Sequence, residues 1–200
     1  GTHVSGIATG NDPTRIPTPL YGIARGADII AIQVFSQFFG LGDVRSYSSD
    51  QIAGLQHVYS LRSTYNIASA NMSLGGGQYS DQASCDSANA GVKAAIDNLR
   101  GAGIATVIAS GNNGFCGFIS GPGCISTAVA VGNTLDNDVE ASSSNYHAPL
   151  LDLYAPGSSI LSSVGNSNSS YSSYSGTSMA APHVAGAWAI LKQKVPSATV

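Results

Sequence analysis

The sequence predicts an α/β protein in which a doubly wound, mostly parallel sheet forms the middle of a three-layer α/β/α arrangement. Short apolar runs alternate along the chain with longer amphipathic runs, as strands and crossover helices do in such a sheet. Several of the short runs are apolar almost throughout, which is typical of parallel strands buried on both faces. A chain of 200 residues, with 43% hydrophobic and 10% charged residues, suits one domain with a sizeable core.

The expected elements follow these runs in chain order. Residues 1–9 are expected to form an apolar helix without an N-terminal cap. Strands are expected at residues 28–35, 66–74, 104–111 and 127–133, with weaker ones at 151–155 and 159–164. Further helices are expected at residues 50–64, 86–99 and 179–195. For the helix over 86–99, Asp86 is the expected N-cap, and Gly101 and Gly103 are expected to end it.

The serine-rich stretch 158–175 allows two interpretations. Its composition fits a flexible linker, but Tyr171 and Tyr174 are interspersed and it lies between a strand and a helix. A surface hairpin or loop of the same domain is therefore the favoured interpretation, and residues 1–200 are treated as a single domain.

Charge and hydropathy exclude two classes of partner. The net charge is −3 and no run of basic residues occurs, so the cationic surface that nucleic-acid binding needs is missing. The longest apolar runs, such as residues 29–32, are too short to span a bilayer. No cofactor is expected either.

Residues 176–186 read Gly-Thr-Ser-Met-Ala-Ala-Pro-His-Val-Ala-Gly and place one hydroxyl at the start of an apolar helix. Ser178 lies beside the positive end of that helix, which favours a negative charge forming there. Pro182 is expected in the first turn, where its missing N–H is harmless. Ala180 replaces the last glycine of a Gly-x-Ser-x-Gly elbow, which weighs against an α/β-hydrolase.

Two more polar or glycine-rich turns follow expected strands. They are Ser73-Leu74-Gly75-Gly76-Gly77 and residues 109–114, Ala-Ser-Gly-Asn-Asn-Gly. Ligands of parallel sheets bind beyond the carboxyl ends of the strands, where both turns are expected.

With residues 176–186, these turns resemble the motifs of the subtilisin-like serine proteases (subtilases, peptidase family S8), and the resemblance covers nearly the whole chain. It implies a subtilisin-like fold in which Ser178 is the acylated nucleophile. Asn112 would complete an oxyanion hole with the Ser178 backbone N–H. The implied substrate is an extended polypeptide whose backbone pairs with Ser73, Leu74, Gly75 and Gly76.

A serine nucleophile needs a general base oriented by a carboxylate, and no histidine of this chain matches that role well. In the family pattern His-Gly-Thr-His-Val-x-Gly the base is the first histidine, whereas His3 matches the second. His183 is expected to point away from Ser178, with His57 on a mid-chain helix and His147 in a loop. The resemblance therefore implies a domain incomplete at both ends, with the base and the aspartate upstream of residue 1 and no activity in this chain alone; His3 as the base is the less favoured alternative.

The resemblance also bears on cysteines and calcium. Cys85, Cys116 and Cys124 allow at most one internal disulfide. A Cys85–Cys124 bridge is favoured over a small Cys116–Cys124 ring. It would tie the loop after the substrate-binding residues 73–76 to the loop 114–124, which is expected to form part of the rim of the substrate pocket. Subtilases often bind calcium in surface loops, but residues 10–22 hold three prolines and the lone Asp12, a poor set of ligands, so no metal is expected.

The expected protein is thus a secreted, monomeric subtilisin-like serine endopeptidase that binds neither nucleic acid nor membrane. Secretion is expected from the family and from a disulfide. The alternative is a non-catalytic relative, a binding or structural domain that keeps the fold without the triad.

Overall fold

The computed structural model describes residues 1–37, 44–165, 167 and 169–200. Its helices are α1 (Thr2–Thr9), α2 (Ser48–Leu61), α3 (Gln82–Ala88), α4 (Ala90–Gly101) and α5 (Thr177–Lys194). Its strands are β1 (Asn11–Asp12), β2 (Leu20–Tyr21), β3 (Ser36–Gln37), β4 (Val44–Arg45), β5 (Ser69–Met72), β6 (Gly76–Tyr79), β7 (Ala105–Ala109), β8 (Ile119–Gly121), β9 (Val129–Thr134), β10 (Leu153–Pro156), β11 (Ile160–Ser163) and β12 (Tyr171–Tyr174).

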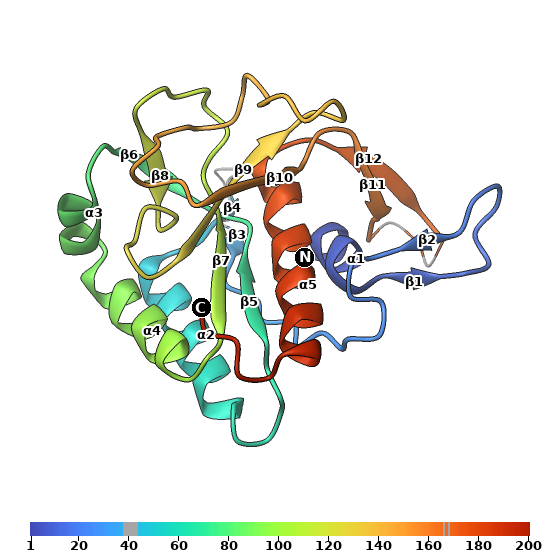
Figure 1. Ribbon diagram of the computed structural model, residues 1–200, viewed down its shortest axis with the longest axis horizontal. Helices are drawn as coiled ribbons and strands as arrows, with labels where there is room; N and C mark the ends of the chain where they lie inside the picture. The colour runs from blue at the N-terminus through green and yellow to red at the C-terminus, as the bar shows by residue number, and fades with distance from the viewer. Residues whose placement is uncertain (38–43, 166, 168) are drawn as a thin grey trace.

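A four-stranded parallel sheet in the order β10-β9-β7-β5 forms the centre of the molecule (Figure 1). Met72 of β5 lies opposite Ile108 of β7, and Ala109 of β7 lies opposite Val131 of β9. Because these strands run in the same direction, their carboxyl ends meet at one edge of the sheet. The predicted α/β/α class is confirmed.

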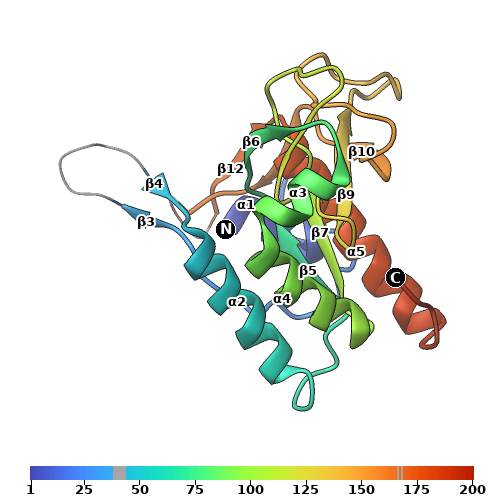
Figure 2. The same ribbon diagram turned by 90° about the vertical axis from the view of Figure 1, so that its left-hand side faces the viewer.

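The two faces of β7 are buried against different helices, as the continuous apolar run predicts. Val107 packs on one face with Ala181 of α5. Ile108 packs on the other face with Ile96 and Leu99 of α4. Figure 1 shows α5 in red along one side of the sheet, and Figure 2 shows α2 and α4 side by side over the other. The sheet therefore holds the N-terminal end of α5 at a fixed place near the carboxyl ends of its strands.

The predicted strand over residues 28–35 is wrong. Within the described part of the chain, these residues belong to no strand. The short strand β3 begins directly after them, at Ser36. Among residues 1–37 and the other described ranges, no strand pairs with the segment, and Ile29 and Ile30 keep 46% and 42% of their surface exposed. An apolar run becomes a strand only when a partner satisfies its backbone groups.

The predicted single helix over residues 86–99 is also wrong in its start. The chain forms two helices, α3 and α4, which meet at Asn89. At this junction the backbone N–H of Asn89 donates to Cys85 O at 3.0 Å, and its side-chain Nδ2 donates to the same oxygen at 2.9 Å. Asp81 caps α3 by accepting from Ser84 N, whereas Asp86 accepts from Ser126 N instead. The chain leaves α4 through Gly103, whose φ of +77° suits glycine, as predicted.

The serine-rich stretch forms a hairpin, as favoured, and not a linker. Strands β11 and β12 pair antiparallel, with Ile160 opposite Tyr174. Residues 166 and 168 of the stretch lie outside the described residues. The hairpin leads directly into Gly176 and α5, so it fixes the approach to the Ser178 helix.

The structure contains the favoured Cys85–Cys124 disulfide, and Cys116 is free and exposed. The two bonded residues are 39 apart in sequence, and both are buried. The bond joins α3, which follows β6, to the segment after β8.

Removing this disulfide is expected to lower the free energy of unfolding by about 4 kcal/mol, since a closed loop of this length restrains the unfolded chain by roughly that amount. The Cys85→Ser/Cys124→Ser double variant tests this in urea unfolding without reductant. Cys116→Ser is the matched control and should leave the free energy unchanged. A peptide map of the unreduced protein that links Cys116 to either partner would contradict the assignment.

Candidate active site

Ser178 is the second residue of α5 and is half-buried. The N–H groups of a helix's first turn have no acceptor within the helix. The Ser178 backbone N–H is therefore free to bind an anion that forms next to its own side chain. This end of α5 lies near the carboxyl ends of β5 and β7, because Ser73 after β5 bonds to Ser178 O and Gly111 after β7 bonds to Thr177 Oγ1. Ligands bind on this side of a parallel sheet.

The sequence predicted Pro182 in the first turn of the helix, and this is wrong. Pro182 lies inside α5. Helix α5 begins at Thr177, two residues earlier than the apolar pattern alone indicates. Because proline has no N–H, the carbonyl of Ser178 loses its partner four residues later. The hydroxyl of Ser73 donates to this carbonyl at 2.7 Å. A side chain directly after β5 thus replaces the missing helical hydrogen bond at Ser178.

The side chain of Asn112 is oriented by the residue that precedes Ser178. Its Oδ1 accepts from Thr177 N at 2.8 Å and from Thr177 Oγ1 at 3.0 Å. Thr177 Oγ1 in turn accepts from Gly111 N at 3.2 Å. These contacts use the carbonyl oxygen of the Asn112 amide, and within the described residues its Nδ2 has no acceptor. An N–H donor is therefore left available beside the N-terminus of α5.

Gly176 allows this close approach. An ideal Cβ at this position would lie 3.1 Å from Asn112 Oδ1 and 3.2 Å from its Nδ2. The backbone φ of Gly176 is +147°, a value that residues other than glycine rarely adopt. The glycine before Thr177 and Ser178 is therefore required by the site's packing as well as by its turn.

The predicted substrate-binding residues lie between β5 and β6. Ser73 and Leu74 follow β5, and β6 pairs antiparallel with β8, so that Gly76 lies opposite Gly121. Gly75 and Gly76 are exposed, while Ser73 contacts Ser178 O through its side chain. The structure thus brings three predicted elements together: Ser178, Ser73 with its following glycines, and, through Thr177, Asn112.

None of the four histidines, among the described residues, hydrogen-bonds to the Ser178 hydroxyl. Nε2 of His3 contacts Ser172 O at 3.0 Å, and its ring stacks on Tyr174. His147 Nε2 contacts Ser80 O at 2.8 Å, and His183 Nδ1 contacts Met179 O at 2.9 Å. The ring nitrogens in these pairs donate to carbonyl oxygens. His57 lies on α2, on the other side of the sheet from α5.

The fold disfavours protonation of the His183 imidazole. Burial lowers the pKa of His183, and its hydrogen bond to Met179 O offsets this only partly. The unfolded chain takes up a proton at His183 near the ordinary value of about 6.5, where the folded chain resists it. Protonation of His183 therefore destabilises the folded protein as the pH falls through about 6.5.

His183→Gln is expected to reduce the loss of unfolding free energy between about pH 7.5 and pH 5.5. The measurement is urea unfolding of parent and variant at both pH values. Since every other group is the same in both proteins, the difference between the two losses isolates His183. Equal losses would show that burial does not lower the pKa of His183.

Residues 10–22, the segment considered for calcium, use their one carboxylate in other contacts. Asp12 Oδ1 accepts from Thr14 N at 3.0 Å and from Thr14 Oγ1 at 2.8 Å, and Asp12 Oδ2 accepts from the Tyr171 hydroxyl. These hydrogen bonds lower the pKa of Asp12, the one to Tyr171 most of all. Across the described ranges, no three His, Cys, Asp or Glu side chains are grouped as a metal ion requires. These donors do not fit a calcium ion.

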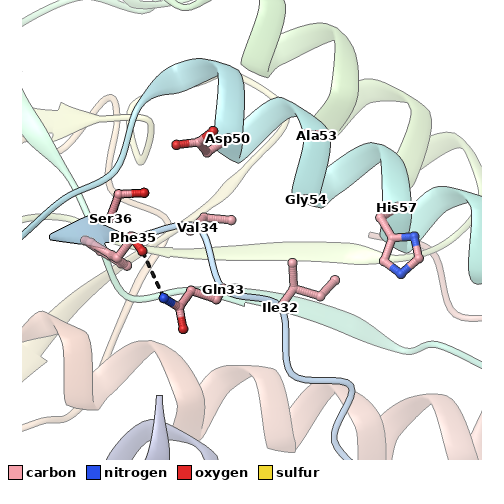
Figure 3. Close-up of a pocket in the computed structure, with 9 residues that line it drawn as sticks. All are labelled: Ile32, Gln33, Val34, Phe35, Ser36, Asp50, Ala53, Gly54 and His57. Atoms are coloured by element: carbon pink, nitrogen blue, oxygen red, sulfur yellow. Dashed lines mark hydrogen bonds between the residues drawn. The ribbon is translucent and has the colours of Figure 1, made fainter.

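A pocket of about 500 Å³ lies away from these residues, between residues 32–36 and α2 (Figure 3). Its polar groups include Asp50, His57 and Gln33, whose Nε2 donates to Phe35 O at 3.1 Å. Asp50 and His57 are seven residues apart on α2, which separates them by about 10 Å along the helix axis. They do not form an acid–base pair, and the pocket contains none of the predicted site residues.

The fold and these contacts define a class of protein: an α/β protein that presents a serine at a helix N-terminus beside an oriented amide. The chain belongs to the subtilase family, peptidase S8, whose model matches residues 1–200. It is 37% identical over 199 residues to the "Extracellular serine proteinase" of Thermus sp. (strain Rt41A), which covers 100% of this chain and 42% of that protein.

Two further comparisons agree with this assignment. The chain is 38% identical to "Subtilisin Savinase" of Lederbergia lenta, over 98% of this chain and 64% of that protein. The crystal structure of a cold adapted subtilisin-like serine proteinase matches with a TM-score of 0.73 at 33% identity, over 98% of this chain and 62% of that one. The chain thus spans about 42% to 64% of the length of these three proteins.

Two residues that organise the site were not identified from the sequence. Thr177 lies inside the quoted motif, and a Ser/Thr hydroxyl at the start of a helix is a signal for capping contacts. Asn145 contacts the Asn112 loop through its side chain, and no local pattern indicates this.

Within the described residues, no helix is long and apolar enough to cross a membrane.

Proposed function

We propose that this chain supplies the nucleophile and the oxyanion hole of a serine endopeptidase. Ser178 attacks the peptide carbonyl, the amine leaves, and water hydrolyses the acyl-enzyme. The observation that carries the proposal is the orientation of Asn112. Its Oδ1 is held by Thr177, so its Nδ2 can donate to the oxyanion together with the Ser178 N–H.

An extended polypeptide is the proposed substrate. Gly75 and Gly76 are exposed, and the side of this segment that faces away from β8 would pair with a substrate strand. Such pairing binds main chain largely independently of side chains. The "Extracellular serine proteinase" relative and the Cys85–Cys124 disulfide support secretion of the protein.

We also propose that the base and its carboxylate come from outside these 200 residues. This is supported by the contacts of His3, His147 and His183, whose ring nitrogens donate to backbone carbonyls away from the Ser178 hydroxyl. The 200-residue chain alone is then expected to be inactive. A non-catalytic relative is the second candidate, and the available Asn112 Nδ2 favours the enzyme over it.

A fluorophosphonate probe tests the proposal on the full-length natural protein. The expected result is one adduct, which peptide mapping places on Ser178, with no adduct on the 200-residue chain alone. Failure of the full-length protein to react would support the non-catalytic relative. An adduct on the 200-residue chain would contradict only the proposal that the base lies elsewhere.

A further inference from the structure

The loop that carries Asn112 is held on two opposite sides. On one side, Thr177 binds the Asn112 side chain and the Gly111 backbone. On the other side, the segment 143–146 runs along the loop. Asn145 N donates to Gly111 O at 2.9 Å, and Tyr146 N donates to Phe115 O at 2.8 Å. The loop thus has a partner on the side away from α5.

The side chain of Asn145 fills the inside of this loop. Its Oδ1 accepts from Asn113 N at 2.9 Å and from Phe115 N at 3.1 Å. Its Nδ2 contacts Ser110 O at 3.2 Å and Ser120 Oγ at 3.1 Å. Asn145 has an exposed fraction of 0%, so its amide has no contact with solvent and depends on these partners.

The backbone at Gly111 shows how tightly the amide is enclosed. An ideal Cβ on Gly111 would lie 2.2 Å from Asn145 Nδ2, and the φ of Gly111 is +110°. Asn113 N, the first donor to Asn145, belongs to the residue directly after Asn112. The Asn145 amide therefore determines where the backbone on both sides of Asn112 can lie.

Ser120 connects the Asn145 amide to β6, the strand that begins at Gly76. Its hydroxyl accepts from Asn145 Nδ2 and donates to Gly77 O of β6 at 3.3 Å. Ser120 N also donates to Ser110 O at 2.9 Å. The buried Asn145 amide thus joins the loop of Asn112 to the wall that follows Gly76.

We infer that Asn145 is a positioning residue for the oxyanion hole, one that holds the 110–115 loop so that Asn112 Nδ2 points at the reacting carbonyl. The inference rests on the proposed function of Asn112. Without the Asn145 amide, the N–H groups of Asn113 and Phe115 lose their acceptor and the loop shifts to find others. A misplacement of about 1 Å costs up to about 10²-fold in rate.

A double-mutant cycle in the full-length enzyme tests this inference. Asn145→Ala is expected to lower kcat by about 10-fold to 10²-fold with little change in KM. In an Asn112→Ala background, the same change should lower kcat hardly at all, because the donor it positions is gone. A purely structural role would lower kcat by the same factor in both backgrounds.

Asn133→Ala is the matched control. Asn133 is an equally buried asparagine, and its Oδ1 accepts from Ser158 Oγ rather than from the 110–115 loop. Its effect on kcat should be the same with and without Asn112. If Asn145→Ala does not fold, Asn145→Asp takes its place in the cycle. It keeps an acceptor for the two N–H groups but places a carboxylate oxygen against Ser110 O, and this repulsion is expected to displace the loop and to lower kcat only where Asn112 is present.

The outcomes separate the two ideas. If Asn112→Ala leaves kcat unchanged, the proposed oxyanion role of Asn112 is wrong. If Asn112→Ala lowers kcat but the Asn145 variants do not, or do so equally in both backgrounds, only the positioning role of Asn145 is overturned.

Discussion

Replacing Ser178 with alanine in the full-length protein is expected to lower kcat about 10⁶-fold, the loss that subtilisin itself shows when its catalytic serine is removed. The change removes one oxygen from a half-buried position, and the backbone contact between Ser73 Oγ and Ser178 O remains. The loss should therefore fall on the chemical step and not on the fold.

The measurement is the initial rate of peptide hydrolysis, with thermal unfolding of both proteins as the control for folding. Ser175→Ala is a matched serine variant close by. Its hydroxyl accepts from Ser159 N at 2.9 Å and, in the part of the chain that the structure describes, makes no hydrogen bond to the Asn112 loop. Retention of activity in Ser178→Ala would exclude Ser178 as the nucleophile.

Replacing Asn112 is expected to lower kcat by about 10²-fold to 10³-fold, again the value known for subtilisin. Two variants separate donation from packing. Asn112→Ala removes the whole amide, whereas Asn112→Asp keeps an oxygen for Thr177 N and Thr177 Oγ1 and removes the Nδ2 donor. Both should lose kcat, and only the alanine variant should also lose the contacts to Thr177.

Steady-state kinetics on the full-length enzyme checks this prediction. KM should change little, because the donor stabilises charge that is present only in the transition state. If Asn112→Asp retained the parent kcat, the amide hydrogen would play no part in the reaction. The role of Asn112 would then be limited to its contact with Thr177.

The central strands could be predicted from the sequence because their residues are apolar almost throughout, which is typical of strands buried on both faces. The runs that contain β7 and β9 are apolar on both faces, so no other element explains them. The segment 28–35 has the same appearance but lacks a hydrogen-bonded neighbour, and pairing is not encoded in a segment's own residues. The division between α3 and α4 falls at Asn89, whose backbone leaves the helical region, and the apolar pattern of residues 86–99 does not mark it.

The candidate site divides in the same way. Ser178 and Asn112 lie in short motifs whose glycines are needed locally, as the positive φ of Gly111 and Gly176 indicates. The contacts that orient them connect residues far apart in sequence: Thr177 is 65 residues from Asn112, and Asn145 is 30 from Phe115. A single sequence carries no local sign of such contacts, so the tertiary structure was needed to find them.

The proline in α5 has a mechanical consequence. A continuous helix can rotate or slide against a sheet by exchanging apolar contacts, since these have little directionality. The hydrogen bond from Ser73 Oγ to the carbonyl left free by Pro182 has a definite length and direction. It fixes the rotation of α5 about its own axis at the turn that carries Ser178, so a gap in the helix's own bonding keeps the serine in register with the strand ends.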